Sequence, residues 1–341
     1  MELTLRKEKI LSSVVTEFLK SGEPVGSKVI AEEIGVSSAT VRNEMSGLTE
    51  MGLLEQPHTS AGRVPSQKGY REFVDRLMEV PSLTPEEKRL MDAKLAPVLY
   101  DTEQLLVRTV ELAASISRCA AAVTTPGGAG ARVRAIQLVQ TSRRTAMLLM
   151  MSSTGTMKNR IFRCDYDLTT DILRVFFRAF NERIAGKKVS DITPAFLQSL
   201  GASLGEMYAL VGAPLRALLE AAHDTARTET LLGGQMNLLF YPEIEPRNAR
   251  NILGLLENKE EFSMLLRQKP GKVTTMIGRE CGRPELDTVS MMVSRYTIDR
   301  QDAGAVAVVG PVRMDYPRLT AVLEYLTDTL SAQLTQLIGE D

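Results

Sequence analysis

Few residues of this chain could carry out acid–base or nucleophilic chemistry. The sequence has two histidines, His58 and His223, and its three cysteines, Cys119, Cys164 and Cys281, lie far apart. A Ser-His-Asp triad, a Cys-His pair or a His-rich metal site would need one of those histidines. The cysteine spacing does not fit a zinc finger and indicates reduced, partly buried thiols. We therefore expect no enzyme activity, no metal and no cofactor.

A second set of residue types could bind the edges of nucleic-acid bases. Arginine can pair with guanine and asparagine with adenine, and an alanine methyl can contact thymine. A helix predicted over 38–51 has a buried stripe of Val41, Met45 and Leu48. Helical rotation places Ala39, Asn43, Ser46 and Glu50 opposite that stripe, with Arg42 and Thr40 on its flanks. An ordinary solvated face of a three-helix bundle is the alternative at this point. The candidate recognition-helix residues are Ser38, Ala39, Thr40, Arg42, Asn43 and Ser46.

A polar hairpin follows this helix, where a wing would contact DNA. Gly52 ends the helix, Leu53 and Leu54 start a strand, and Val64 begins the return strand, which ends at Pro65. Side-chain hydroxyls and arginine are usual phosphate contacts. The candidate wing residues are His58, Thr59, Ser60, Arg63 and Lys68.

The elements that would position both sets of residues can be followed from the N-terminus. Residues 6–20 are apolar on one face at helical spacing. Ser27 can cap a second helix that ends near Ile34, and Gly35 permits a tight turn before the third. Two helices joined by such a turn form a helix-turn-helix. After the hairpin, Ser66 caps a further helix.

The net charge does not by itself indicate a nucleic-acid partner. The chain carries a net charge of −1, and residues 1–78 hold ten Lys/Arg against eleven Asp/Glu. A basic surface is the usual footprint of DNA binding. The stretch from 56 to 71 is locally basic, with Arg63, Lys68 and Arg71 and no acid. Any DNA contact must therefore rest on a local patch.

Four segments together carry a resemblance to a known family. They read EPVGSK, VSSATVRNEM, PHTSAGRVPSQKGYR and, near the C-terminus, GPVRMDYP. In this order they resemble the bacterial heat-inducible transcription repressor HrcA across nearly the whole chain. Val312 is a departure, because the family more often has threonine there. The resemblance implies a sequence-specific repressor of chaperone genes.

Beyond the hairpin, the chain alternates helices and strands, which indicates an α+β fold. A linker at 81–85 precedes a helical segment over 86–122 that is interrupted at Pro97. Short turns predict an antiparallel meander of three strands near 133–140, 145–152 and 156–163. The later elements expected are helices over 168–184, 191–230, 248–266 and 316–337 and strands over 231–238, 273–277, 288–297 and 303–309.

The resemblance gives these elements a domain organisation. It implies an N-terminal winged helix-turn-helix over 1–80, then a linker and helix over 81–100. A GAF-like α+β domain over 101–198 and 271–341 would be interrupted by an inserted, mostly helical dimerisation domain over 199–270. We expect a packed core in the GAF-like domain rather than a ligand pocket.

The implied partners are double-stranded DNA with an inverted repeat, a second copy of the chain and a GroEL-type chaperonin. Heat would divert the chaperonin to unfolded protein, and the repressor would become inactive. No apolar run reaches the length of a membrane span and the charged N-terminus lacks a signal-peptide core, so a cytoplasmic location is expected. The alternative is a ligand-sensing GAF-type regulator whose winged head binds a protein partner.

Two further motifs have plain structural interpretations. The glycines at 127, 128 and 130 lack the Gly-Lys-Ser/Thr ending of a phosphate loop and precede a strand, which indicates a connector. In GPVRMDYP, Asp315 or Tyr316 lies near the N-cap of the last helix and Pro317 lies in its first turn.

Overall fold

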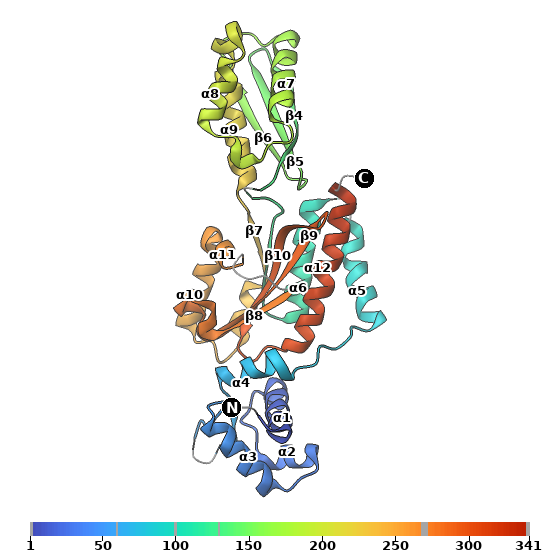
Figure 1. Cartoon of the computed structure of the whole chain (residues 1–341), viewed down its shortest axis with the longest axis vertical. Coiled ribbons are helices and arrows are strands. Elements are labelled where there is room, and N and C mark those ends of the chain that lie inside the picture. Colours follow the sequence, from blue (N-terminus) through green and yellow to red (C-terminus); the bar gives the residue numbers. More distant parts are fainter. Residues whose placement is uncertain (1–2, 59–60, 99–100, 129, 267–271, 339–341) are drawn as a thin grey trace.

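The computed structural model describes residues 3–58, 61–98, 101–128, 130–266 and 272–338. The molecule is elongated, with three parts stacked along its longest axis (Figure 1). We call them the head (residues 3–77), the body, which is built on a five-stranded sheet, and the distal lobe (residues 130–228). The head and the distal lobe lie at opposite ends of the body.

The head has the predicted order of helices and short strands. Thr4 and Ser37 cap the first and third helices, and Gly22 and Gly35, both in the left-handed region, end the first and second. A two-stranded antiparallel sheet forms the wing. The elements are α1 (Leu5–Ser21), α2 (Ser27–Ile34), α3 (Ser38–Glu50), β1 (Leu54–Glu55), β2 (Val64–Pro65), α4 (Gln67–Glu72) and η1 (Phe73–Leu77).

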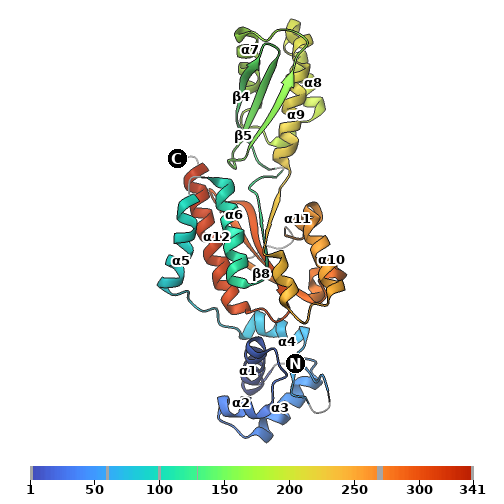
Figure 2. The same ribbon diagram turned by 180° about the vertical axis from the view of Figure 1, so that it is seen from behind.

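The body is an antiparallel sheet in the order β7-β3-β10-β9-β8, with helices on both faces. The strands are β3 (Ala120–Thr124), β7 (Thr230–Gly233), β8 (Val273–Ile277), β9 (Val289–Ile298) and β10 (Gln301–Pro311). Along β10, Val306 and Val308 join the core under α5 (Pro85–Leu95), α6 (Thr102–Ser117) and α12 (Tyr316–Ile338), whereas Ala305 and Ala307 join the core on the opposite face. Figure 2 shows α6 and α12 in front of the sheet.

The opposite face is covered by shorter helices. These are η5 (Gln235–Phe240), α10 (Pro246–Glu257) and α11 (Lys259–Leu266), and η2 (Ala96–Val98), η6 (Gly278–Cys281) and η7 (Pro284–Leu286) complete the body. The single helix predicted over 248–266 is thus two helices, which meet at Asn258.

One body strand was predicted as helix. The sequence predicts a helix as far as residue 122, whereas Ala120–Thr124 forms β3 between β7 and β10. Its alanines favour a helix by intrinsic propensity. All five residues are buried, because helices cover both faces of the sheet. The position in the sheet, which local sequence does not encode, overrides that propensity.

The distal lobe is a three-stranded antiparallel sheet with helices on one face. The predicted meander is confirmed, and its strands are β4 (Val133–Ser142), β5 (Thr145–Ser152) and β6 (Met157–Arg163). Its helices are α7 (Thr170–Ile184), η3 (Val189–Asp191), α8 (Pro194–Ala202), η4 (Gly205–Leu210) and α9 (Gly212–Ala226).

Strand pairing divides the chain differently from the predicted boundaries at 198 and 271. The meander, which we assigned to the same domain as the later strands, forms a sheet of its own. Strand β7, which we assigned to the insertion, pairs with β3 through Leu231 and Val123. The segment that leaves the body sheet therefore lies between β3 and β7. Periodicity identifies strands, but it does not say which strands pair across a hundred residues.

All three cysteines are buried, as free thiols. Burial raises the pKa of the Cys119 thiol to about 11, so this thiol is neutral and unreactive near pH 7. Within the described ranges, no helix is both long and apolar enough to cross a membrane, and no cluster of His, Cys, Asp or Glu could hold a metal.

Candidate nucleic-acid interface

Helix α3 is held in the head by its cap and its apolar stripe. The amide of Thr40 donates to the Ser37 hydroxyl at 3.1 Å, which closes the first turn. Val41, Met45 and Leu48 are buried in the head core, as predicted. The opposite face of the helix therefore points to solvent.

Four of the six candidate residues lie on that exposed face. Ala39, Arg42, Asn43 and Ser46 are exposed, and among the residues described the side chains of Arg42, Asn43 and Ser46 make no hydrogen bond or ion pair. Their polar groups are available for base edges, which makes this face suitable for direct readout.

The other two candidates help to build the head. The Ser38 hydroxyl bonds the Ser27 hydroxyl at 2.9 Å, which ties α3 to α2. The Thr40 hydroxyl bonds that of Ser37 at 2.8 Å and completes the cap. Both side chains are partly buried. They hold α3 in place and do not form its exposed face.

The wing cations fold back toward the C-terminal end of α3. The Arg63 Nε donates to the Thr49 hydroxyl at 3.1 Å, and the Lys68 Nζ donates to the Met51 carbonyl at 3.0 Å. His58 is exposed at the start of the wing loop, whereas Thr59 and Ser60 lie outside the described residues. The two cations thus place positive charge beside the recognition helix.

The wing is fixed close to the loop before α2. The backbones of Val25 and Arg63 exchange two hydrogen bonds of 2.9 Å. A Cβ at Gly62 would lie 2.4 Å from the Val25 carbonyl oxygen. Only glycine permits this approach, so the wing is docked against the helix-turn-helix.

One acid near the reading face is neutralised within the head. Glu44 pairs with Lys7, and it lies 3.8 Å from the Arg6 guanidinium. Both cations come from α1. Glu44 therefore turns toward α1, and its charge is balanced within the head. Sequence reasoning did not find this pairing, since Glu44 is distant in the chain from Arg6 and Lys7.

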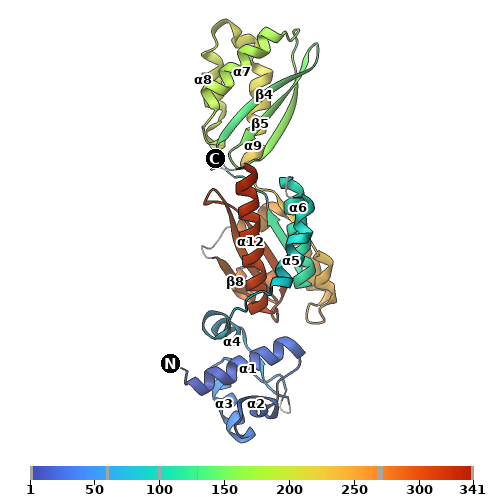
Figure 3. The same ribbon diagram turned by 90° about the vertical axis from the view of Figure 1, so that its right-hand side faces the viewer.

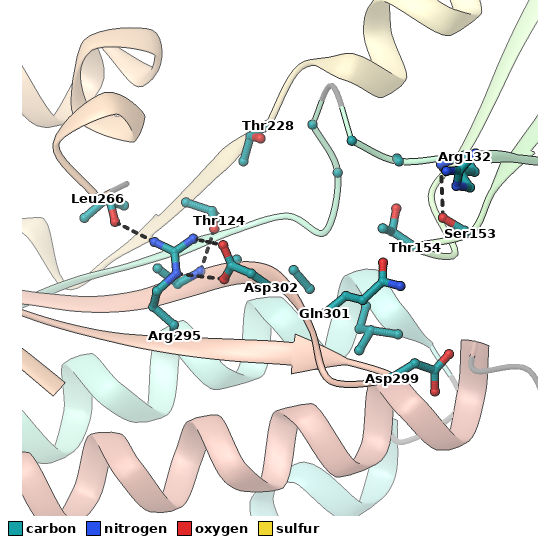
Figure 4. A pocket seen from close by; sticks show the side chains of 18 of the residues that line it. Thr124, Arg132, Ser153, Thr154, Thr228, Leu266, Arg295, Asp299, Gln301 and Asp302 are labelled. Carbon is teal, nitrogen blue, oxygen red and sulfur yellow. Dashed lines mark hydrogen bonds and ion pairs between the residues drawn. The ribbon is translucent and has the colours of Figure 1, made fainter. Parts of the chain in front are cut away.

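A separate polar hollow of about 530 Å³ lies where the body meets the distal lobe (Figure 4). The Arg295 guanidinium lies along one side of the hollow, where it donates to Asp302 at 2.7 Å and to the Leu266 carbonyl at 3.2 Å. Arg132 and Ser153 line the opposite side. The hollow is at the end of the sheet, whose two faces are packed.

Comparison with known proteins covers both parts of the chain. A family profile described as "Winged helix-turn-helix transcription repressor, HrcA DNA-binding" matches residues 2–77. A second profile, described as "HrcA protein C terminal domain", matches residues 103–320.

Full-length relatives agree with these profiles. The chain is 35% identical over 343 residues to the heat-inducible transcription repressor HrcA of Desulforudis audaxviator, and 34% identical over 344 residues to that of Moorella thermoacetica, with 99% of each chain covered in both cases. A crystal structure described as that of a hypothetical protein at 2.2 Å resolution has a TM-score of 0.65 at 23% identity, covering 98% of this chain and 100% of that one. That last likeness concerns the fold alone.

Proposed function

Because the chain belongs to the HrcA family of heat-inducible transcription repressors, we propose that it binds an inverted-repeat operator as a homodimer and reads it with the exposed face of α3. It is a DNA-binding transcriptional repressor and not an enzyme. A repressor that acts on the chromosome works in the cytoplasm. The main support for base readout by α3 is that polar side chains on its exposed face make no contact within the described part of the protein.

The roles of individual residues follow from their surroundings. Arg42 and Asn43 are exposed and lie in the N-terminal half of α3, where recognition helices meet base edges. Arg63, Lys68 and His58 would contact phosphates on the flank, together with Thr59 and Ser60 of the wing loop. Phosphate contacts position the head, and base contacts choose the sequence.

Substitution of the two reading residues tests this assignment. Arg42→Ala and Asn43→Ala should each cost about 1–3 kcal/mol of operator binding and leave binding to a scrambled duplex unchanged. Gel-shift titrations on both duplexes give the two affinities. Arg178→Ala, an exposed arginine in the distal lobe, is the control. Equal losses on the two duplexes would mean that Arg42 and Asn43 contact only phosphate.

The homodimer is supported by an uncovered sheet face in the distal lobe. Helices α7 and α9 pack on one face of β4–β6. On the other face Val139, Met157 and Ile161 are 46%, 56% and 69% exposed, and Met147 and Leu149 lie between them on β5. An exposed apolar surface of this kind is typical of an interface. A second copy placed by a two-fold axis would cover it.

The chaperonin part of the proposal rests on the family resemblance and on this same face. A monomer would expose the apolar sheet, and chaperones bind transiently exposed apolar surface. The chaperonin would therefore hold monomers and return them to the operator-binding dimer. Adding a GroEL-type chaperonin to heated repressor should restore operator binding in a gel shift. If binding does not recover, this part of the proposal fails.

The domain division also takes a revised form. We assign the GAF-like domain to 102–124 and 230–338 and the inserted dimerisation domain to 130–228, because strand pairing separates these segments. A winged head that binds only a protein partner is disfavoured, since the matched DNA-binding profile covers the whole head.

A further inference from the structure

The head touches the body through α4, which lies between the two (Figure 3). The Arg71 guanidinium donates to Glu280 at 3.0 Å and to the Thr275 carbonyl at 2.8 Å. The Gln67 side-chain amide donates to the Ile277 carbonyl at 2.5 Å. All three acceptors belong to β8 and η6 of the body. Two side chains of one head helix thus bond a single turn of the body.

The turn that receives α4 has a fixed shape. The Ile277 amide donates to the Glu280 carboxylate at 3.0 Å, so the acid that binds Arg71 also closes its own turn. Gly278 has a φ of +52°, and a Cβ there would lie 2.8 Å from the Asp287 carbonyl oxygen. The turn is therefore held by contacts within the body itself, and it presents its carbonyls in set directions.

Aromatic packing extends the same contact. The rings of Tyr70 in α4 and Tyr316 at the start of α12 meet edge to face, with centroids 6.0 Å apart. Burial raises the pKa of both phenols above the usual value of 10, so the pair stays neutral. Tyr70, Phe73 and Tyr316 belong to one apolar core that runs from the head into the body.

The covalent connection alone would not orient the head. After η1 the chain has no regular structure from 78 to 84, where α5 begins after its Thr84 cap. A linker without regular secondary structure restricts the relative rotation of two domains less than a continuous helix would. The side-chain contacts of α4 therefore contribute to the orientation of the head.

We propose that Arg71, together with Gln67 and Tyr70, acts as a positioning residue that fixes the head on the body and so sets the half-site spacing at which a dimer binds its operator. This inference rests on the proposed dimeric, operator-binding function. Two rigidly held heads meet two half-sites at one separation, and the second contact is favoured by a high effective concentration. Freely rotating heads would lose that advantage and accept other separations.

Binding to operators of altered spacing tests the proposal. The probes are an inverted repeat selected from a random pool by the protein itself, its single half-site, and versions with the spacer changed by about one or two base pairs. Arg71→Met should bind the half-site as the wild type does. It should bind the full repeat roughly 10-fold more weakly and discriminate less among spacers. Glu280→Gln, which keeps an oxygen for the Ile277 amide, should behave in the same direction.

Arg76→Met is the matched control. Arg76 lies one turn further along, and its partners Glu72 and Glu8 both belong to the head. This variant should keep the wild-type spacing preference. If Arg71→Met also keeps that preference, or if it loses half-site and full-repeat affinity equally, the proposal is overturned.

A measurement without DNA separates this inference from the proposed function. Spin labels at exposed positions 9 in the head and 257 in the body (Lys9→Cys and Glu257→Cys) report the distance between them, with labelled chains diluted in unlabelled ones. The wild type and Arg76→Met should give a narrow distribution, and Arg71→Met and Glu280→Gln a broad one. A narrow distribution in every variant would overturn the positioning role, even if the wild type bound no inverted repeat.

Discussion

On the exposed face of α3, the side chains of Arg42, Asn43 and Ser46 make no contact inside the described part of the protein, unlike the polar side chains at the start of the helix and on its buried flank. Thr40 and Ser38 serve the cap and the α2 contact, and Glu44 pairs with α1. A side chain that is free before binding can pair with a base edge without breaking an internal hydrogen bond. This difference supports the reading role that we propose for Arg42 and Asn43, the two longer of these side chains.

The two tyrosines at the contact between head and body allow a sharp test at the residue scale. The Tyr316 hydroxyl donates to the Val312 carbonyl and bonds the Ser290 hydroxyl at 2.8 Å. The Tyr70 hydroxyl is buried and has no partner within the described residues. A buried polar group without a partner costs about 1–3 kcal/mol, whereas a satisfied one contributes about 1 kcal/mol.

Tyr70→Phe should therefore raise the melting temperature, and Tyr316→Phe should lower it. Each change removes one oxygen from the same aromatic pair, so the two variants control for each other. Differential scanning calorimetry gives both values. A lower melting temperature for Tyr70→Phe would show that the hydroxyl does have a partner in solution.

The sequence predicted which residues of the head are candidates but not what each one contacts. The buried stripe of α3 follows from periodicity, so its exposed face could be predicted. The inward turn of Arg63 toward Thr49 depends on the docking of the wing against Val25, which is set by tertiary structure. The same limit explains why Arg71 was seen as part of a basic run rather than as a contact with the body.

Among the elements, the exposed outer face of β4–β6 allows a test of the proposed dimer interface. Ile161→Asp places a charge on the proposed dimer interface, and burying an unpaired charge is strongly unfavourable. Because Ile161 is already exposed in a single chain, the fold should tolerate the change. The variant should sediment as a monomer in analytical ultracentrifugation, whereas the wild type should sediment as a dimer.

Val175→Asp is the control for that change. Val175 is also exposed and lies on α7, away from the sheet face. This variant should remain a dimer. The opposite pattern, with Val175→Asp monomeric and Ile161→Asp dimeric, would move the interface to the helical side of the lobe.

Element boundaries were predicted closely wherever one local signal dominated. The strand at Val273–Ile277 and the start of the last helix at Tyr316 match the predictions, and Asp315 caps that helix by accepting from the Arg318 amide at 3.2 Å. Strand β3 was not predicted because alanine favours a helix by itself. These alanines form a strand because helices cover both faces of the sheet at this position. The pairing of β3 with β7 could not be predicted, because the two strands are distant in the chain.

For the whole molecule, the near-neutral net charge is unusual for a DNA-binding protein, because such proteins commonly have a basic surface. The structure offers a local answer, since Lys68 and Arg63 lie beside α3 and Glu44 is paired away from it. Non-specific affinity scales with the number of phosphates that cations neutralise. A repressor with few such contacts should depend more on base readout and on holding two heads at once.

In the proposed complex, the two heads of one dimer read the two halves of an inverted repeat. The most direct test is a titration of the wild-type protein against the inverted repeat, its single half-site and a scrambled duplex at one salt concentration. A dimer that reads both half-sites should form a complex of two chains per inverted repeat, with affinity at least about 10³-fold above that for the scrambled duplex and well above that for the half-site. Equal affinity for the inverted repeat and the scrambled duplex would contradict it.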